Sequence, residues 1–482
     1  MRGFYALLAF AAALALLLFM SELDPPLGVL ELASGGFTAP SECDIANFAQ
    51  LKKSAIVYTW VNGSEPCYNK RRVKAKLSPG GSSRDKEMGE LKYSIRSLLQ
   101  FAPWLEGPIY IVTPGQIPDW LDTSNPRIRV VDQDDLLPKD LVTLPNFDTN
   151  VIEQFLHKIP GLTDTFIHMN DDYLFIKPVK PTRFFTCDGG LQFLSEINHI
   201  RHVKGQNSNA WLASVRNTVE LADKIYGGEH AYNFLKHAPF VYSRKAFEKI
   251  HEKFGKELHA SHSHQVRHFE DLNMPLLHHI YMNEEGSRLL NIPIRWNPIA
   301  ECDDWLLIRI TDTDHAGLER DFARALQGRG PEILFALNDE YSKPETAALV
   351  RKFYGALLPN RAPHELPLGQ FVKVQSNYHG KDCTYDRAII PFPTAPAGGA
   401  AAIPPPSSLR QEGTAEKPSS MLQDARFESF FAGVATSKSS TGLGNLGFLL
   451  GIALGVVCSI YIFRLANNDD HFGGSAHSSK SR

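Results

Sequence analysis

The sequence has no excess of charge of either sign. Its 50 Lys and Arg residues nearly balance 53 Asp and Glu residues, for a formal net charge of −3. Proteins that bind nucleic acid usually carry a basic excess or a basic stripe, so a nucleic-acid partner is not expected. No internal repeat is visible. The 482 residues are enough for two or three domains, or for one large domain with appendages.

Cysteine is scarce, and its spacing excludes a zinc knuckle. Six cysteines occur in the chain, and Cys458 lies within a long apolar run. The other five are an odd number, so at most two disulfides can form among them within the chain, and their pairing stays open. They are Cys43, Cys67, Cys187, Cys302 and Cys383.

Both ends carry apolar runs of membrane-spanning character. Residues 4–20 are apolar, and no small-residue cleavage site follows them, so we favour a signal-anchor over a cleaved signal peptide. Residues 446–463 form an uncharged run that predicts a transmembrane helix, and Arg464 beyond it predicts a cytosolic tail. The protein is therefore expected to be embedded in a membrane of the secretory pathway, with its folded part in the lumen.

The composition divides the chain into successive segments. A Pro-, Ala-, Gly- and Ser-rich stretch precedes the C-terminal apolar run and is typical of an extended tether. The predicted segments are a signal-anchor or signal peptide (1–22), a stalk (23–53), a folded domain (54–375), a linker (376–442), a transmembrane helix (443–465) and a cytosolic tail (466–482).

The folded part begins with alternating strands and helices. Short apolar runs rich in β-branched residues predict strands at 55–61, 108–113, 128–132 and 165–170, and helical spacing of apolar residues predicts helices within 90–100 and 151–159. This alternation predicts an α/β fold with a Rossmann-like, largely parallel sheet. The second half reads as more helical, with helices at 263–282, kinked at Pro275, and at 340–357.

Polar residues follow several of the predicted strands. Asp171 and Asp172 interrupt the apolar run TFIHMNDDYLFIKP, and buried carboxylates need a partner, a hydrogen bond or a metal. Asn62 and Gly63 end the first strand. Because ligands of parallel sheets bind at the carboxyl ends of strands, we expect these groups to gather at one rim.

Five stretches of the folded part form one ordered set. They are YTWVNG (58–63), GELKYSIRSLLQFAPWLEGPIYIVTPGQIPDWL (89–121), LPNFDTNVIEQFLHKIPGLTDTFIHMNDDYLF (144–175), SHQVRHFEDLNM (263–274) and FALNDE (335–340). In this order they resemble the conserved regions of the Stealth family of hexose-1-phosphate transferases. The resemblance implies transfer of a sugar-1-phosphate from a nucleotide-sugar, UDP-N-acetylglucosamine or GDP-mannose, to a hydroxyl, with a Golgi location. The interval between the second and third regions leaves no room for the acceptor modules of the animal lysosomal enzyme. A glycan or another glycoprotein is therefore the expected acceptor, and a homodimer stays open.

The resemblance also implies roles for single residues. Mg²⁺, with Mn²⁺ as an alternative, suits a diphosphate and oxygen ligands. The expected catalytic residues are Asp171, Asp172, His237 as general base and Arg267 as phosphate clamp; the expected metal ligands are Asp172, Asp171 and Asp339; and the expected donor-binding residues are Trp60, Asn62, Gly63, Arg96, Asn170 and Asn338.

Several of these assignments have a plainer alternative. Asn62 begins an N-glycosylation sequon, and Asn338 and Asp339 could cap a helix. His264 and His268 invite zinc, but such sites bring a third defined ligand, and oxygen ligands suit the expected chemistry better. Two other functions remain open. One is a glycosyltransferase that attacks the anomeric carbon, and the other is a membrane-tethered glycan-binding protein without turnover.

Overall fold

The computed structural model describes residues 48–80, 86–200, 209–299, 305–328, 330, 332–372, 374–375 and 384–385, and for 298–299, 338–340, 374–375 and 384–385 it describes the backbone alone. No helix in these ranges is long and apolar enough to cross a membrane. The two predicted membrane segments, the stalk up to residue 47 and most of the linker lie outside the described residues.

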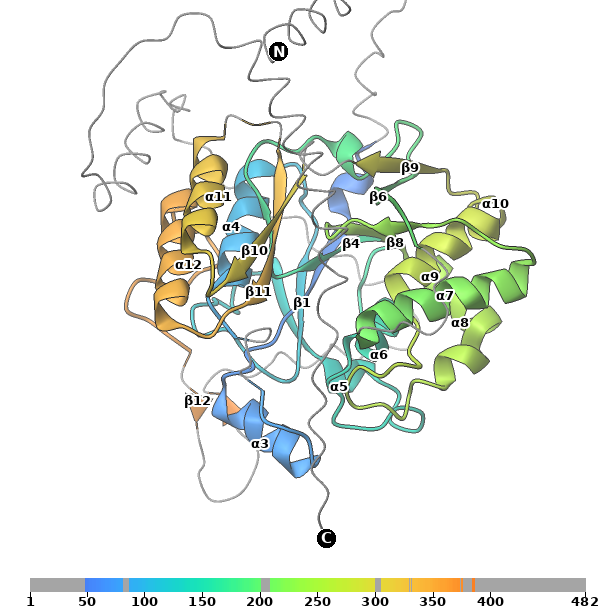
Figure 1. Cartoon of the computed structure of the whole chain (residues 1–482), viewed down its shortest axis with the longest axis horizontal. Coiled ribbons are helices and arrows are strands. Elements are labelled where there is room, and N and C mark those ends of the chain that lie inside the picture. Colours follow the sequence, from blue (N-terminus) through green and yellow to red (C-terminus); the bar gives the residue numbers. More distant parts are fainter. Residues whose placement is uncertain are drawn as a thin grey trace, which may run out of the picture. The chain divides into compact units, whose positions relative to one another are not determined.

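A five-stranded sheet forms the centre of the described part (Figure 1). Its order is β3-β2-β1-β4-β8, and β8 alone runs antiparallel to its neighbour. The strands are β1 (Ala55–Thr59), β2 (Ile109–Thr113), β3 (Ile128–Asp132), β4 (Thr165–Asn170) and β8 (Phe240–Ser243). The four predicted strands and their parallel pairing are confirmed. Their continuous apolar sequences reflect burial on both faces of the sheet.

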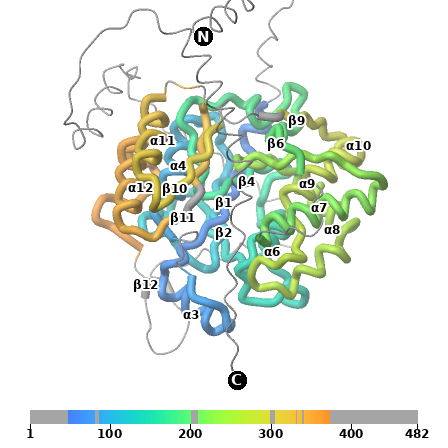
Figure 2. The backbone as a smooth tube through the Cα atoms, in the orientation of Figure 1, coloured from blue at the N-terminus to red at the C-terminus, as the bar shows by residue number. Residues whose placement is uncertain are grey.

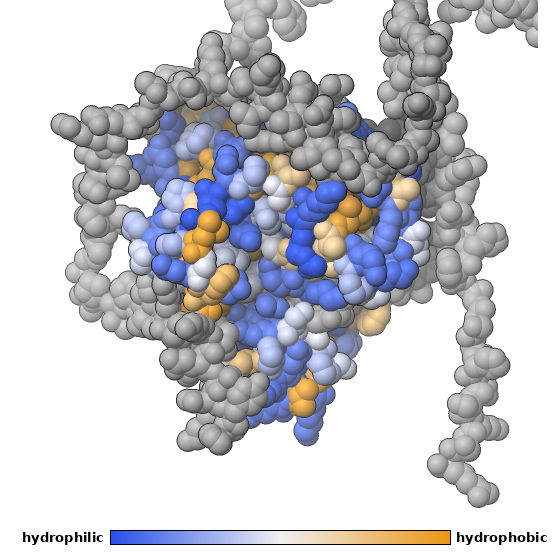
Figure 3. Space-filling view, turned by 90° about the vertical axis from the view of Figure 1, so that its left-hand side faces the viewer, coloured by the Kyte–Doolittle hydropathy of each residue, from blue (hydrophilic) through white to orange (hydrophobic). Residues whose placement is uncertain are grey.

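A second sheet lies beside the first. Its order is β10-β11-β5, built from β5 (Tyr173–Phe175), β10 (Trp305–Thr311) and β11 (Leu334–Glu340). The helices α4 (Glu90–Phe101), α11 (His315–Gln327) and α12 (Pro344–Leu357) lie on this side of the molecule (Figures 1 and 2). Phe322 of α11 stacks on Phe353 of α12 with ring centroids 4.0 Å apart. This side of the surface is mainly hydrophilic, with separate small apolar groups between the polar ones (Figure 3).

A helical layer covers the opposite side (Figure 2). It contains α6 (Thr149–Gln154), α7 (Ala210–Tyr226), α8 (Arg244–His259) and α9 (Met274–Tyr281), with the 3₁₀ turn η2 (Leu156–Lys158) after α6. Asp148 caps α6 by accepting a hydrogen bond from the amide of Asn150, as expected for an acidic residue at a helix start. Val219 of α7 and Ile280 of α9 are fully buried in one apolar cluster between these helices.

Smaller elements complete the described chain. A third sheet has the order β7-β6-β9, and two short strands pair on their own. The remaining elements are η1 (Leu51–Lys53), α3 (Pro66–Lys74), α5 (Gln133–Leu136), η3 (Pro181–Arg183), β6 (Leu191–His199), β7 (Asn233–Leu235), η4 (Met282–Gly286), α10 (Ser287–Leu290), β9 (Ile294–Ile299), β12 (Val374–Gln375) and β13 (Thr384–Tyr385).

The helix predicted at 263–282 is wrong over its first half. Residues 263–273 form a loop, and α9 begins only at Met274. Asn273 caps α9 by accepting a hydrogen bond from the amide of Leu276 at 3.0 Å. Pro275 lies in the first turn, where its missing N–H costs no helical hydrogen bond, so it starts the helix instead of kinking it.

Candidate active site

A cavity of about 300 Å³ opens at the carboxyl ends of the central strands. The predicted convergence of strand-end residues is therefore observed: Thr59 ends β1, Pro114 follows β2, Gln133 follows β3, and Asn170 ends β4. The lining also includes Trp60, Val61, Tyr68, Lys86, Glu90, Val112, Phe147, Thr149, Ile152, Glu153, Asp171, Asp172, His237, Arg267 and Leu337. All four predicted catalytic residues thus share one cavity.

The acidic pair forms the turn between β4 and β5. Asp171 and Asp172 are the two residues that connect these strands, so the chain leaves the central sheet where the carboxylates lie. The turn relaxes the strict alternation of a strand, which would send adjacent side chains to opposite faces. Both carboxylates consequently line the same cavity.

His237 connects Asp172 to Tyr173. Its Nε2 lies 3.0 Å from Oδ2 of Asp172, and its Nδ1 lies 3.2 Å from the Tyr173 hydroxyl. A carboxylate oxygen can only accept, so Nε2–H of His237 donates to Oδ2 of Asp172, and the Tyr173 hydroxyl, which accepts from Nδ2 of Asn170 at 3.3 Å, donates its own proton to Nδ1. This network assigns the tautomer in which Nε2–H donates to Asp172. Both ring nitrogens of His237 are therefore engaged.

Asp172 presents an oxygen that suits a cation. Its Oδ1 is buried and has no hydrogen-bond partner among the described residues. Burial of an unpaired carboxylate oxygen is costly unless a cation or a donor compensates it. Asp171 lies on the same cavity wall, and carboxylate oxygens are the ligands that Mg²⁺ prefers. The residues present fit a bound divalent cation.

Arg267 reaches the cavity from the 263–273 loop. Its Nε donates to Oγ1 of Thr149 at 2.8 Å, which orients the guanidinium. Its two terminal amino groups form no hydrogen bond within the described ranges. An oriented guanidinium with free donors matches the fork geometry that binds phosphate oxygens.

Glu153 is a cavity residue that the sequence analysis missed. It lies on α6, and burial raises the pKa of its carboxyl group to about 7, although the positive charge of Arg267 lowers it in part. The carboxylate forms no hydrogen bond to any described residue. Glu153 lies next to the apolar stripe of its helix, so periodicity alone predicts a solvent-facing position. Its closeness to the strand-end rim comes from the position of α6.

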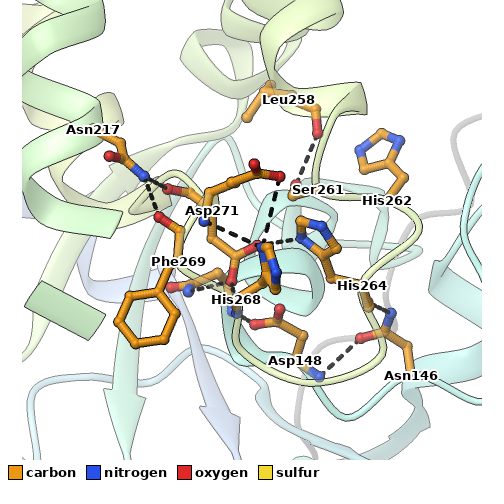
Figure 4. A network of polar contacts seen from close by, with 12 residues as sticks. Asn146, Asp148, Asn217, Leu258, Ser261, His262, His264, His268, Phe269 and Asp271 are labelled. Atoms are coloured by element: carbon orange, nitrogen blue, oxygen red, sulfur yellow. Dashed lines mark hydrogen bonds and ion pairs between the residues drawn. The ribbon is translucent and has the colours of Figure 1, made fainter. Parts of the chain in front are cut away.

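The 263–273 loop is held in place by a fully buried carboxylate (Figure 4). Asp271 accepts hydrogen bonds from Nδ1 of His264 at 2.7 Å, from the amide of His268 at 2.6 Å and from Nδ2 of Asn150 at 3.1 Å. Burial and the neighbouring carboxylate of Asp271 raise the pKa of Asp148. Asp271 therefore fixes the loop on either side of Arg267.

Trp60, Asn62 and Gly63 are held by contacts of their own. The indole N–H of Trp60, in the cavity lining, donates to Oε2 of Glu87 at 2.6 Å. Oδ1 of Asn62 accepts from the amide of Ser64 at 3.0 Å, and the backbone of Asn62 is bound by the side chain of Gln116. Asn62 and Gly63 are not among the residues that line the cavity, and Gly63 lies in a turn after β1.

Arg96 is not brought to the cavity lining. The guanidinium of Arg96 forms two hydrogen bonds of 2.6 Å to Glu365 and one of 2.7 Å to the carbonyl of Leu358. Burial alone would raise the pKa of Glu365, but these hydrogen bonds hold it below the usual value. Asn338 and Asp339 lie in β11, not at a helix start, and their side chains lie outside what the structure describes. Their predicted roles stay predictions.

Two of the cysteines form disulfides. Cys67, in α3, and Cys187 are each disulfide-bonded. Disulfides form and persist mainly in oxidising compartments; the lumenal location of the folded part stays a prediction.

Three family models match the chain in order. They are the Stealth protein conserved regions 1, 2 and 3, which match residues 56–79, 84–193 and 236–284. The regions include the acidic pair, His237 and Arg267. The chain belongs to the Stealth family.

Curated relatives of the chain are named as polysaccharide phosphotransferases. An exopolysaccharide phosphotransferase of Streptomyces coelicolor is 31% identical over 321 residues, which cover 64% of this chain and 51% of the relative. A capsular polysaccharide phosphotransferase of Haemophilus influenzae is 35% identical over 246 residues, which cover 49% of this chain and 66% of the relative. The chain thus spans about half to two thirds of the length of these two proteins.

Among solved structures, the chain resembles the galactosyltransferase LgtC in complex with donor and acceptor sugar analogues. The sequence identity is 11%, the match covers 65% of this chain and 98% of that chain, and the TM-score is 0.31. A score this low does not establish a common architecture.

Proposed function

We propose that this protein transfers a sugar-1-phosphate from a nucleotide-sugar to a hydroxyl group of a glycan. The observation that carries the proposal is the shared cavity, in which an acidic pair with an unpaired buried oxygen lies with an oriented guanidinium at the strand ends. The names of the relatives, exopolysaccharide and capsular polysaccharide phosphotransferases, support the same reaction class.

The reaction is a displacement at the β-phosphorus of the donor. The acceptor oxygen forms a bond to this phosphorus, and the bond from phosphorus to the oxygen that bridges the α- and β-phosphates breaks. A nucleoside monophosphate leaves with the electron pair, and the acceptor proton passes to a base. Such a reaction needs positioning and charge neutralisation more than covalent chemistry. Arg267 binds the phosphate oxygens through its terminal amino groups.

Asp172 and Asp171 hold the divalent cation, Mg²⁺ or Mn²⁺, in this proposal. When bound, the cation supplies positive charge that neutralises the diphosphate. His237 fixes the Asp172 carboxylate through the 3.0 Å contact at Oδ2 and leaves Oδ1 for the cation. A residue that orients a metal ligand in this way commonly affects metal affinity as well as rate.

Glu153 accepts the acceptor proton in this proposal. Both nitrogens of His237 are occupied by Asp172 and Tyr173, whereas the Glu153 carboxylate has no hydrogen-bond partner in the described part of the chain. Its pKa of about 7 lies in the range where a general base works well at neutral pH. His237, which the sequence analysis predicts as the general base, is the alternative, and mutation of Glu153 and of His237 distinguishes between the two.

The proposal extends to the donor, the acceptor and the location of the reaction. UDP-N-acetylglucosamine and GDP-mannose are the donors to test first, and glycans or glycoproteins of the Golgi lumen are the acceptors. The purified full-length chain is incubated with a panel of nucleotide-sugars and Mg²⁺ or Mn²⁺, and the released nucleotide is identified by mass spectrometry. Release of UMP or GMP supports the proposal. Release of UDP or GDP instead contradicts it and indicates glycosyl transfer.

A further inference from the structure

A second group of possible metal ligands lies outside the cavity. His264, His268 and Glu270 each offer a ligand atom, and these atoms all lie within 4.8 Å of one another. None of the three lines the cavity that holds the acidic pair. The rings of His264 and His268 lie next to each other, with centroids 4.1 Å apart (Figure 4).

His264 is already oriented as a metal ligand would be. Its Nδ1 donates to Oδ1 of Asp271 at 2.7 Å, and the Asp271 side chain is fully buried. This hydrogen bond keeps the proton on Nδ1 and leaves the lone pair of Nε2 available. A carboxylate behind a histidine is the usual support of a histidine that binds zinc, because it fixes the ring and raises its basicity. Asp271 is therefore a second observation, independent of the distances, that points to a cation.

The other two ligands are open to solvent. The side chain of His268 is 48% exposed and that of Glu270 is 77% exposed. Nδ1 of His268 accepts a hydrogen bond from the amide of Glu270 at 3.3 Å, so Nε2 is the ring nitrogen that faces an ion. Glu270 also borders a second hollow of the surface, next to Lys224 of α7. An ion can therefore reach the group from water and can keep a water molecule as a further ligand.

We propose that His264, His268 and Glu270 bind a zinc ion. Two imidazoles and one carboxylate suit zinc, whereas Mg²⁺ prefers oxygen ligands alone. The ligands lie on both sides of Arg267 in the sequence, so the ion links the two arms of the 263–273 loop. It thereby holds the segment that carries the guanidinium into the cavity. The proposal does not depend on the reaction proposed above.

The charges around the group are mixed. Asp271 lies behind His264, and the raised pKa of Asp148 favours its protonated form. Arg267 carries the nearby positive charge, but its guanidinium is turned to Thr149 and to the cavity. The carboxylates of Glu270 and Asp271 offset it, so a doubly charged cation is not opposed by an excess of positive charge.

The test measures zinc bound to the purified full-length chain. Isothermal titration with Zn²⁺ is performed in excess Mg²⁺, and bound zinc is counted by mass spectrometry after gel filtration. We expect one zinc ion per chain. His268→Asn and Glu270→Gln change exposed side chains, so the fold survives, which circular dichroism checks, and each should abolish the stoichiometric zinc. Asp271→Asn should weaken binding about 10- to 100-fold.

Two variants serve as matched controls. His259→Asn removes an exposed histidine at the end of α8, and Asp172→Asn removes a carboxylate of the cavity; both should keep the zinc. Co²⁺ in place of zinc should give a visible absorption band that disappears in His268→Asn. The proposal is overturned if the chain binds no zinc, if His268→Asn and Glu270→Gln bind it as the unmodified chain does, or if zinc is lost in Asp172→Asn alone.

Discussion

Nε2 of His237 lies 3.0 Å from Oδ2 of Asp172, across 65 positions of the sequence. The contact joins a residue three positions before β8 to the turn after β4, and these two strands are neighbours in the central sheet. It occupies one oxygen of the carboxylate and leaves the other buried and unpaired. His237 thereby orients the Asp172 carboxylate.

Replacing His237 separates orientation from proton transfer. His237→Gln can keep an N–H near Oδ2 of Asp172, whereas His237→Ala cannot. We expect His237→Ala to weaken the apparent affinity for Mg²⁺ about 10- to 100-fold, with His237→Gln much closer to the unmodified enzyme. Activity titrations against Mg²⁺ concentration measure both. If the Gln variant were as inactive as the Ala variant at saturating Mg²⁺, His237 would act as the base.

Glu153 predicts a pH dependence of the reaction. Burial raises the pKa of its carboxyl group to about 7, so the charged form that accepts a proton increases as the pH rises through 7. The value of kcat/KM should therefore rise through this range and level off above it. The other titratable groups around Glu153 are Arg267, Asp171, Asp172, His237, Lys86 and Glu90 in the cavity lining, and Tyr173 and Tyr242, whose hydroxyl pKa values the Glu153 carboxylate raises.

Glu153→Gln tests this assignment at nearly constant volume. It should lower kcat by about 10²- to 10⁴-fold and remove the limb near pH 7, while the Kd for the donor changes little. Glu90→Gln is the matched control, because Glu90 also lines the cavity but starts a different helix. A Glu153→Gln enzyme that kept the same pH profile would exclude the carboxylate as the base.

Arg96 is predicted to matter for stability and not for the donor. Its side chain and that of Glu365 are 9% and 5% exposed, and removal of one partner from such a pair costs about 3–5 kcal/mol. Arg96→Met should lower the free energy of unfolding in urea by this amount and leave the donor Kd unchanged. Arg129→Met, at an exposed arginine, should change stability by less than about 0.5 kcal/mol.

The same pair should contribute to acid sensitivity. The pKa of Glu365 is held below its usual value of 4.5 in the folded protein. Its stabilisation is therefore complete above the usual pKa and is lost as the pH falls through the lower folded value. The free energy of unfolding of the unmodified chain, measured between pH 6 and pH 3, should show this loss, and that of Arg96→Met should not.

A dissociation constant for the donor that rose sharply in Arg96→Met would contradict a purely structural role and would restore the predicted role of Arg96 in donor binding.

The strands were predictable because their signal is local. The four parallel strands are short apolar runs, and their order along the chain placed the acidic pair at the rim of the sheet. The conformation of the 263–273 loop was not predictable, because it depends on hydrogen bonds to residues distant in the sequence, such as Asn150. Arg96 is a similar case, since its partner Glu365 lies 269 positions away. Local spacing carries no signal for either contact.

The central claim concerns which bond of the donor breaks. A nucleotide-sugar labelled with ³²P at its β-phosphate is incubated with the full-length chain, Mg²⁺ and a glycan acceptor, with Asp172→Asn as the inactive control. The account predicts that the label appears in the acceptor in a phosphodiester, with unlabelled nucleoside monophosphate released in equal amount. Label recovered in a released nucleoside diphosphate, with sugar but no phosphate on the acceptor, would contradict it.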